Sequence, residues 1–318
     1  MITSQILVND LYKILTSQIS NPRFYKARAR GFRNELNFEK ILHQRQYKIL
    51  DAGQFLFTKK NSAHSVENEI IYVTVSDDDK DKYLEFYAQI SRIDEIKNAF
   101  FVSVHDLTTW KTEPITIKNE KKKKIEEIIV KPEFSVYKFN DDGWISSNFD
   151  EIKELLIKRK IRISAKKSRE PLEYLEKYDF NELAKVYANR YFLDIELISY
   201  NKGMMDFDHI VLHEGKFVVV ETKEKDPMRD KKNPSDTSKW AFGWDSRRFG
   251  WYFYLKHKIE LDSWYVIGEI KEQTNREFVG WKKIEFDKFC KCISWLAERS
   301  GGGGGGTMSA PYLAFDDF

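Results

Sequence analysis

One stretch constrains the fold more than any other: residues 207–223, FDHIVLHEGKFVVVETK. It holds two apolar, β-branched runs of strand length, joined by the four residues His213–Lys216, which include a glycine. Two such runs with so short a connection are typical of a β-hairpin. The second run is apolar on both faces of the predicted strand, which favours a place in the middle of a sheet.

The register of this hairpin follows from its loop. If the last apolar residue before the loop faces the first one after it, Asp208 lies opposite Glu221 and Asp206 lies opposite Lys223. Side chains alternate between faces along a strand, so these four charged groups share one face. Opposed carboxylates repel each other, and we therefore expect a Glu221→Ala variant to resist heat better than the parent.

A divalent cation between the carboxylates would reverse the sign of this interaction. Mg²⁺ takes oxygen ligands and often uses only one or two carboxylates, together with phosphate and water. We predict that Asp208 and Glu221 bind Mg²⁺, for which Mn²⁺ can substitute, and that Lys223 acts beside them. Asp206 is an alternative ligand, although its expected place opposite Lys223 favours an ion pair. The sequence leaves the number of metal ions open.

Asp208 and the run Glu221-Thr222-Lys223 resemble the core motif of the PD-(D/E)XK nuclease superfamily, to which many restriction endonucleases belong. The stretch is particularly similar to the nuclease-related (NERD) branch, where an Asp-His-hydrophobic strand precedes an apolar strand ending in Glu-Thr-Lys. The resemblance covers residues 171–300, with Phe207 where the superfamily name has Pro. It implies a restriction-endonuclease-like mixed sheet flanked by helices, in the order α-β-β-β-α-β.

In this superfamily the first helix often supplies a further acidic residue. Residues 179–192 show helical spacing of apolar residues, and Asp179 or Asn181 can cap the start. Glu182 is the acidic candidate, although a first-turn Glu also complements the helix dipole. The other expected elements are a strand over 195–200, a polar loop over 225–238, a helix over 239–258 and a strand over 263–270.

The residue types suit hydrolysis of a phosphodiester. A metal ion can neutralise developing charge and lower the pKa of a bound water, and Lys223 can stabilise the oxyanion or orient the water. We predict a Mg²⁺-dependent endodeoxyribonuclease of restriction, genome-defence or mobile-element type. Cleavage of both strands suggests a homodimer or a partner protein. The alternative is a non-catalytic nucleic-acid- or protein-binding module on a decayed nuclease fold.

Basic residues are clustered, although the net charge of the chain is only +3. The clusters lie at 23–33, 121–124 and 158–169. Local basic patches are expected of a protein that binds the phosphate backbone, although a single run is more often a solvated surface. A solvated helix face is also the alternative for the arginine pair at 247–248. The residues for which we predict DNA contacts are Arg28, Arg30, Lys225, Arg247 and Arg248.

The length of 318 residues, with 42% hydrophobic residues, predicts two packed domains. We place an N-terminal α/β domain at 1–157, a basic linker at 158–170 and the nuclease domain at 171–300. The N-terminal domain is predicted to recognise or position the substrate, and a degenerate copy of the nuclease fold is the alternative. Its expected elements are helices over 32–43 and 80–96 and strands over 47–58, 70–75 and 100–104.

The last residues differ in composition from the rest. The glycine run 301–306 predicts a flexible linker, and we exclude residues 301–318, which also contain the peptide 307–318, from the predicted fold. This acidic-aromatic peptide looks either engineered or like a tethered partner motif. Its last residues resemble the acidic, Phe-terminated tips of single-strand-DNA-binding proteins.

The two cysteines, Cys290 and Cys292, have poor spacing for zinc and no partner ligands nearby. Buried free thiols in a helical stretch over 289–296 are the better interpretation. No apolar run approaches the roughly 20 residues that a membrane helix needs. We therefore expect a cytoplasmic protein without disulfides or a membrane segment.

Overall fold

The computed structural model describes residues 2–18, 22–58, 69–118, 124–158, 172–201, 205–272, 275–296 and 306–318. The chain has the expected mixed α/β class. It divides into two compact units, which we describe separately: unit 1 contains residues 1–36 and 51–206, and unit 2 contains residues 37–50 and 207–318. In the ranges described, no helix combines the length and the apolar character needed to cross a membrane.

This division differs from the domain boundaries predicted at 157 and 171. The helical region after residue 171 belongs to unit 1, whereas the short segment 37–50 belongs to unit 2. The chain therefore leaves unit 1 and returns to it before the hairpin begins. Apart from Lys158, the predicted basic linker lies outside the described residues, as does most of the basic run 121–124.

Unit 1 is built on a six-stranded mixed sheet. Its second and third strands form an antiparallel hairpin, the fourth is parallel to the third, and the remaining neighbours are antiparallel. A short helix, α3 (Leu84–Ile90), connects the two parallel strands. The strands in spatial order are β11 (Met205–Asp206), β2 (Gly53–Phe57), β3 (Ile70–Ser76), β4 (Ile96–Val104), β7 (Phe134–Asn140) and β8 (Gly143–Ser147).

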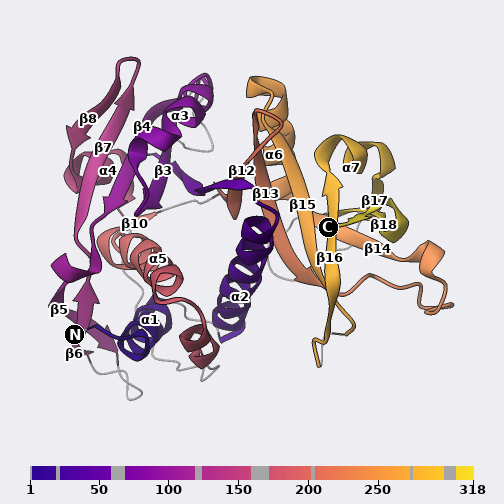
Figure 1. The fold of residues 1–318 in the computed structure, drawn as a ribbon, viewed down its shortest axis with the longest axis horizontal. Helices are drawn as coiled ribbons and strands as arrows, with labels where there is room; N and C mark the ends of the chain where they lie inside the picture. Colours follow the sequence, from indigo (N-terminus) through magenta and orange to yellow (C-terminus); the bar gives the residue numbers. More distant parts are fainter. Residues whose placement is uncertain are drawn as a thin grey trace. The chain divides into compact units, whose positions relative to one another are not determined.

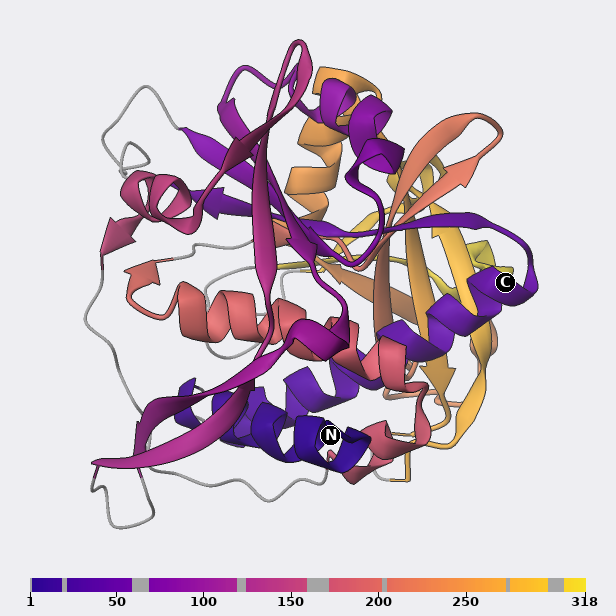
Figure 2. The ribbon, with the colours of Figure 1, turned by 60° about the vertical axis from the view of Figure 1, so that its left-hand side comes forward.

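The helices of unit 1 share an apolar core. Helices α1 (Ser4–Gln18) and α5 (Phe180–Tyr191) lie side by side, as Figure 2 shows. Leu11 of α1 and Leu183 of α5 are completely buried in this core. The other elements are α2 (Pro22–Gln44), which continues into unit 2, β5 (Lys111–Lys118), β6 (Lys124–Lys131), α4 (Phe149–Leu155), β9 (Ile157–Lys158) and β10 (Tyr200–Asn201).

The strand predicted over 195–200 is wrong. The chain continues from α5 as a π-helical turn, η4 (Phe192–Glu196), and only Tyr200 of the predicted range lies in a strand. Apolar side chains explain the difference, because Phe192, Leu193 and Leu197 are buried together in the core beneath the sheet. These three positions point into the core when the helical backbone continues beyond α5.

Unit 2 contains a second six-stranded sheet (Figure 1). Its strands in spatial order are β1 (Lys48–Asp51), β12 (His209–His213), β13 (Lys216–Lys225), β15 (Asp262–Ile270), β16 (Phe278–Glu285) and β19 (Asp316–Asp317). The predicted hairpin register is confirmed, because Leu212 pairs with Phe217 and His209 pairs with Val220. Strand β13 has partners on both sides, as its apolar composition predicted.

The two sheets share one order of connections. In each, a hairpin is followed by a strand parallel to its second member, and an antiparallel strand comes next. One face of the sheet of unit 2 is covered by the second half of α2, through Phe38 and Leu42. Helix α5, expected in that role, has its core contacts in unit 1. Residues from α2 and β1 therefore complete unit 2, which contains the hairpin.

The later elements of unit 2 also differ from expectation. The helix predicted over 239–258 begins as strand β14 (Ala241–Asp245), and α6 spans Ser246–Ile259. Helix α7 (Phe286–Cys292) ends before β17 (Ser294–Leu296), and both cysteines are free and only partly buried. The exclusion of residues 307–318 from the fold is wrong: β18 (Thr307–Pro311) lies between β14 and β17, and β19 pairs with β16.

Candidate active site

The charged residues of the hairpin lie on the face of β13 that points away from α2. Val218 and Val220 pack in the core that contains Phe38 of α2. Because side chains alternate along a strand, Glu221 and Lys223 face the opposite side. There α6 supplies Arg248 and Tyr252, both in contact with Glu221.

Glu221 is fully buried, with 0% of its side chain exposed. Its Oε1 lies 2.6 Å from Nζ of Lys223. Its Oε2 accepts hydrogen bonds from Nη1 of Arg248 at 2.5 Å and from the hydroxyl of Tyr252 at 3.0 Å. A buried carboxylate is costly unless it is paired and hydrogen-bonded, and here two cations and a hydroxyl compensate for its burial.

Asp208 is held at the start of the hairpin by the opposite strand. Its backbone N–H donates to the Val220 carbonyl at 2.9 Å. Its Oδ2 accepts from the Thr222 N–H at 2.6 Å and from Thr222 Oγ1 at 2.9 Å. These bonds fix the carboxylate against the strand that carries Glu221.

The ammonium group of Lys223 is surrounded by three oxygens. Nζ lies 2.6 Å from Glu221 Oε1, 3.8 Å from Asp208 Oδ2 and 2.9 Å from the backbone carbonyl of Thr222, to which it donates. Burial alone would lower the pKa of Lys223, but the charges of Asp208 and Glu221 outweigh it and raise that pKa. Both carboxylates therefore face one cation position.

This donor set suits a hard cation. Two carboxylates and a carbonyl are oxygen ligands of the kind that Mg²⁺ accepts, with water and phosphate in its remaining positions. In the part of the chain that the structure describes, no group of three or more His, Cys, Asp or Glu side chains could hold a metal ion. Protein ligation would thus rest on Asp208, Glu221 and the Thr222 carbonyl.

Two of the predicted acidic residues lie in unit 1. Glu182 accepts a hydrogen bond from the N–H of Asp179 at 3.3 Å and forms a capping box at the start of α5. Asp206 belongs to β11 and pairs with Gln54 of β2. Its expected place opposite Lys223 is wrong, because β12 of the unit 2 sheet begins only at His209.

The residues predicted to contact DNA belong to both units. Arg28 and Arg30 are partly exposed on α2 in unit 1. Arg247 is exposed at the start of α6, whereas Arg248 binds Glu221. The ammonium of Lys225 donates to the Gly243 carbonyl, and burial together with the charge of Lys223 lowers its pKa to about 8.

Tyr252 is a site residue that sequence reasoning missed, and the contact of Arg248 with Glu221 was not predicted. Arg248 was predicted to contact phosphate, and Tyr252 was not singled out. Their spacing of four residues places them on one face of a helix, which is a usable signal. The side chain of Asp245 caps this helix through the N–H groups of Arg247 and Arg248.

A second charged cluster lies at the corresponding end of β3 in unit 1. Ser76 donates to Asp51, and the ammonium of Lys185 lies 3.7 Å from Asp51 and 3.3 Å from Asp77. Burial raises the pKa of Asp51, while Lys185 opposes this shift. Ser76, Asp77 and Lys185 also line a cavity of about 240 Å³. Unit 1 thus has a carboxylate–lysine cluster without a Glu-x-Lys sequence.

Comparison of the chain with protein-family models, with curated proteins and with solved structures found no match in any of the three.

Proposed function

We propose that unit 2 is a Mg²⁺-dependent nuclease of the PD-(D/E)XK type, which hydrolyses phosphodiester bonds in DNA. The observation that carries this proposal is the ring of oxygens around Lys223 Nζ, with carboxylates from both strands of the central hairpin. Further support comes from the elements of unit 2, because α2, β1, β12, β13, α6 and β15 follow one another in the α-β-β-β-α-β order when the insertion between β1 and β12 and the short strand β14 are left out.

Each residue then has a role that follows from its contacts. Asp208, Glu221 and the Thr222 carbonyl would hold the metal ion. When bound, this ion supplies charge neutralisation at the phosphate and lowers the pKa of a water ligand. Arg248 and Tyr252 donate hydrogen bonds to Oε2 of Glu221 and orient its carboxylate. Lys223 provides a positive charge beside the reacting phosphate, where it stabilises the oxyanion.

A second candidate function is a non-catalytic binding module on the same fold. The charge balance of the four charged side chains at the site favours this binding module, because the charges of Lys223 and Arg248 offset those of Asp208 and Glu221. Such a cluster can persist as a structural ion-pair network. The two functions predict opposite results in a cleavage assay.

The test is nicking of supercoiled plasmid DNA by the full chain in Mg²⁺. We expect the parent to relax the plasmid, and Glu221→Gln and Lys223→Met to lose at least about 100-fold in rate, because each removes a group needed in the transition state. Glu214→Gln and Lys216→Met, on the exposed loop side of the same hairpin, are matched controls that keep the parent rate.

Circular dichroism establishes that all variants are folded before their rates are compared. Equal nicking by the parent and by both site variants would refute the proposed site. A folded parent that binds DNA but does not cleave it in Mg²⁺ or Mn²⁺ would favour the binding module.

A further inference from the structure

Residues 307–318, hereafter the docked segment, are bound along one face of unit 2. Its first five residues form β18, which pairs with β14 on one side and with β17 on the other. Phe242 of β14 pairs with Ala310, and Ser294 of β17 pairs with Ser309. Because β14 and β17 are joined only through β18, the docked segment satisfies two strand edges at once.

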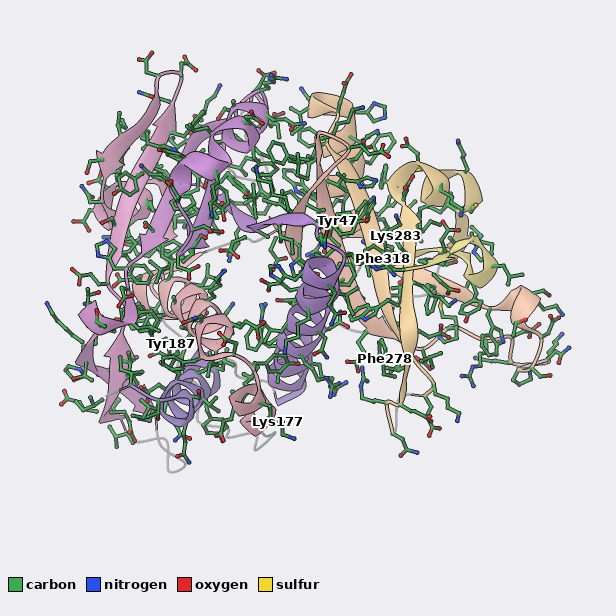
Figure 3. All side chains as sticks on the ribbon, in the orientation of Figure 1. Tyr47, Lys177, Tyr187, Phe278, Lys283 and Phe318 are labelled. Carbon is green, nitrogen blue, oxygen red and sulfur yellow. The ribbon has the colours of Figure 1, made fainter. Side chains whose placement is uncertain are left out.

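The last residue of the docked segment lies among aromatic rings. The Phe318 ring centroid lies 4.9 Å from that of Phe38 and 6.0 Å from that of Trp264. Figure 3 shows Phe318 close to Tyr47 and Lys283, and the guanidinium of Arg45 lies 4.6 Å from the centre of its ring. Aromatic and cationic contacts of this kind add binding energy beyond area burial.

The acidic residues of the docked segment meet lysines of unit 2. Asp316 accepts from Lys288 at 2.8 Å, and Asp317 accepts from Lys282 at 2.9 Å. The backbone N–H of Phe318 donates to the Trp281 carbonyl at 2.9 Å. The charges are therefore complementary, with acidic groups on the segment and basic groups on the face that receives it.

The middle of the docked segment is anchored as well. Phe315 is buried, and its ring centroid lies 5.1 Å from that of Phe242. The hydroxyl of Tyr312 lies 3.0 Å from Oε2 of Glu269, a carboxyl whose pKa is raised by burial. The segment thus presents a short strand, a Tyr, a Phe and an Asp-Asp-Phe end, each with its own partner.

The sequence before the docked segment suits a ligand on a tether. Residues 301–306 are six glycines, which carry no side chains and specify no packing. A strand that completes open edges, with pockets for particular side chains, is a recurrent form of peptide recognition. A segment held in this way can be replaced by another of the same chemistry.

We propose that this face of unit 2 is a docking surface for a protein segment with an edge-pairing strand followed by aromatic residues and Asp-Asp-Phe. Residues 307–318 occupy it within the same chain, and a second polypeptide carrying such a segment binds there when the resident one is displaced. The surface is defined by β14, β17, the ring pocket of Phe38 and Trp264, and Lys282 and Lys288.

The test uses a fluorescein-labelled peptide with the sequence of residues 307–318 and the full chain. In the double variant Ala310→Asp, Phe318→Ala, the resident segment buries a charge and loses its terminal ring, which should vacate the surface. We expect saturable binding to this variant by fluorescence anisotropy. The parent should bind at least about tenfold more weakly, because its own segment is covalently attached and competes at a local concentration on the order of millimolar.

A charge exchange separates recognition from nonspecific binding. In the vacated variant, Lys282→Glu with Lys288→Glu should abolish binding of the native peptide and restore binding of a peptide with Asp316→Lys and Asp317→Lys. No binding by the vacated variant, no rescue by the exchange, or loss of cooperative unfolding in the vacated variant would each overturn the proposal. The measurement needs neither metal nor DNA, so its outcome is independent of the nuclease proposal.

Discussion

At the residue scale, the environment of Glu221 reverses an expectation drawn from the strand register. Register alone places two carboxylates opposite each other, so removal of one should relieve repulsion. In the structure the carboxylate of Glu221 instead binds Lys223 and Arg248, and Asp208 is held by Thr222. One of these two cations, Arg248 of α6, is 27 residues away from Glu221 along the chain.

We therefore expect Glu221→Ala to destabilise the protein. The substitution leaves Lys223 and Arg248 without their shared carboxylate, and breaking a buried pair costs about 3–5 kcal/mol. Both cations are partly exposed, so the loss should lie near the lower end of this range. Urea unfolding measures it, with Glu214→Ala on the exposed loop as a control that changes little. A higher melting temperature for Glu221→Ala would show that repulsion dominates after all.

Lys225 should make stability depend on pH. Its folded-state pKa of about 8 lies below the ordinary value of 10.5, so the folded state carries fewer protons than the unfolded state between these limits. Burial of the charged ammonium of Lys225 therefore destabilises the folded state fully below pH 8. This destabilisation disappears as the pH rises toward 10.5. Lys225→Met should therefore raise the melting temperature at pH 7.

That advantage should shrink between pH 8 and pH 10.5, which thermal melts of parent and variant across this range would reveal. The Gly243 carbonyl keeps its bond from the Tyr265 hydroxyl in the variant. A difference in melting temperature that stays constant at every pH would mean that the pKa of Lys225 in the folded protein is not lowered.

At the element scale, helix α6 links the sheet to the site. Asp245 ends β14 and caps α6, while Arg248 and Tyr252 on that helix hold Glu221. The predicted helix over 239–258 missed this transition, because Trp240 and Trp244 also fit helical spacing. In β14, Trp244 instead stacks on Tyr265 of the neighbouring sheet, with ring centroids 4.3 Å apart.

Removal of this cap should weaken unit 2 and its site together. Asp245→Ala deletes the side-chain acceptor for two backbone N–H groups of α6, and the loss of an N-cap typically costs about 1 kcal/mol. Asp245→Asn keeps an acceptor oxygen and is the matched control. Urea unfolding should separate the two variants. Equal midpoints for both would show that the cap contributes little to stability.

At the scale of the whole molecule, two sheets with the same order of connections occur in one chain. The sheet of unit 1 has its own cluster of Asp51, Asp77 and Lys185 at the matching strand end. This agreement in topology is what a degenerate copy of one fold would produce. Because residues 37–50, which contain the second half of α2, belong to unit 2, the domain boundaries predicted from a linear order differ from the division of the structure.

The amino-acid sequence by itself determined the local elements of the site. Two apolar, β-branched runs and a short glycine-containing loop were enough to predict the hairpin, its register and the meeting of Asp208 with Glu221 and Lys223. Helix α5 and strand β15 were also predictable, because their apolar spacing is strong.

Only the tertiary structure decided which distant elements complete that hairpin. The sheet of unit 2 takes its helix from α2, its counter-charge from Arg248 and its last strand from the docked segment. Long-range packing selects among several amphipathic segments of similar character, and local periodicity contains no information about that choice. The sequence of α5 predicts that this helix buries an apolar face. Which sheet or helix it packs against depends on how the whole chain folds.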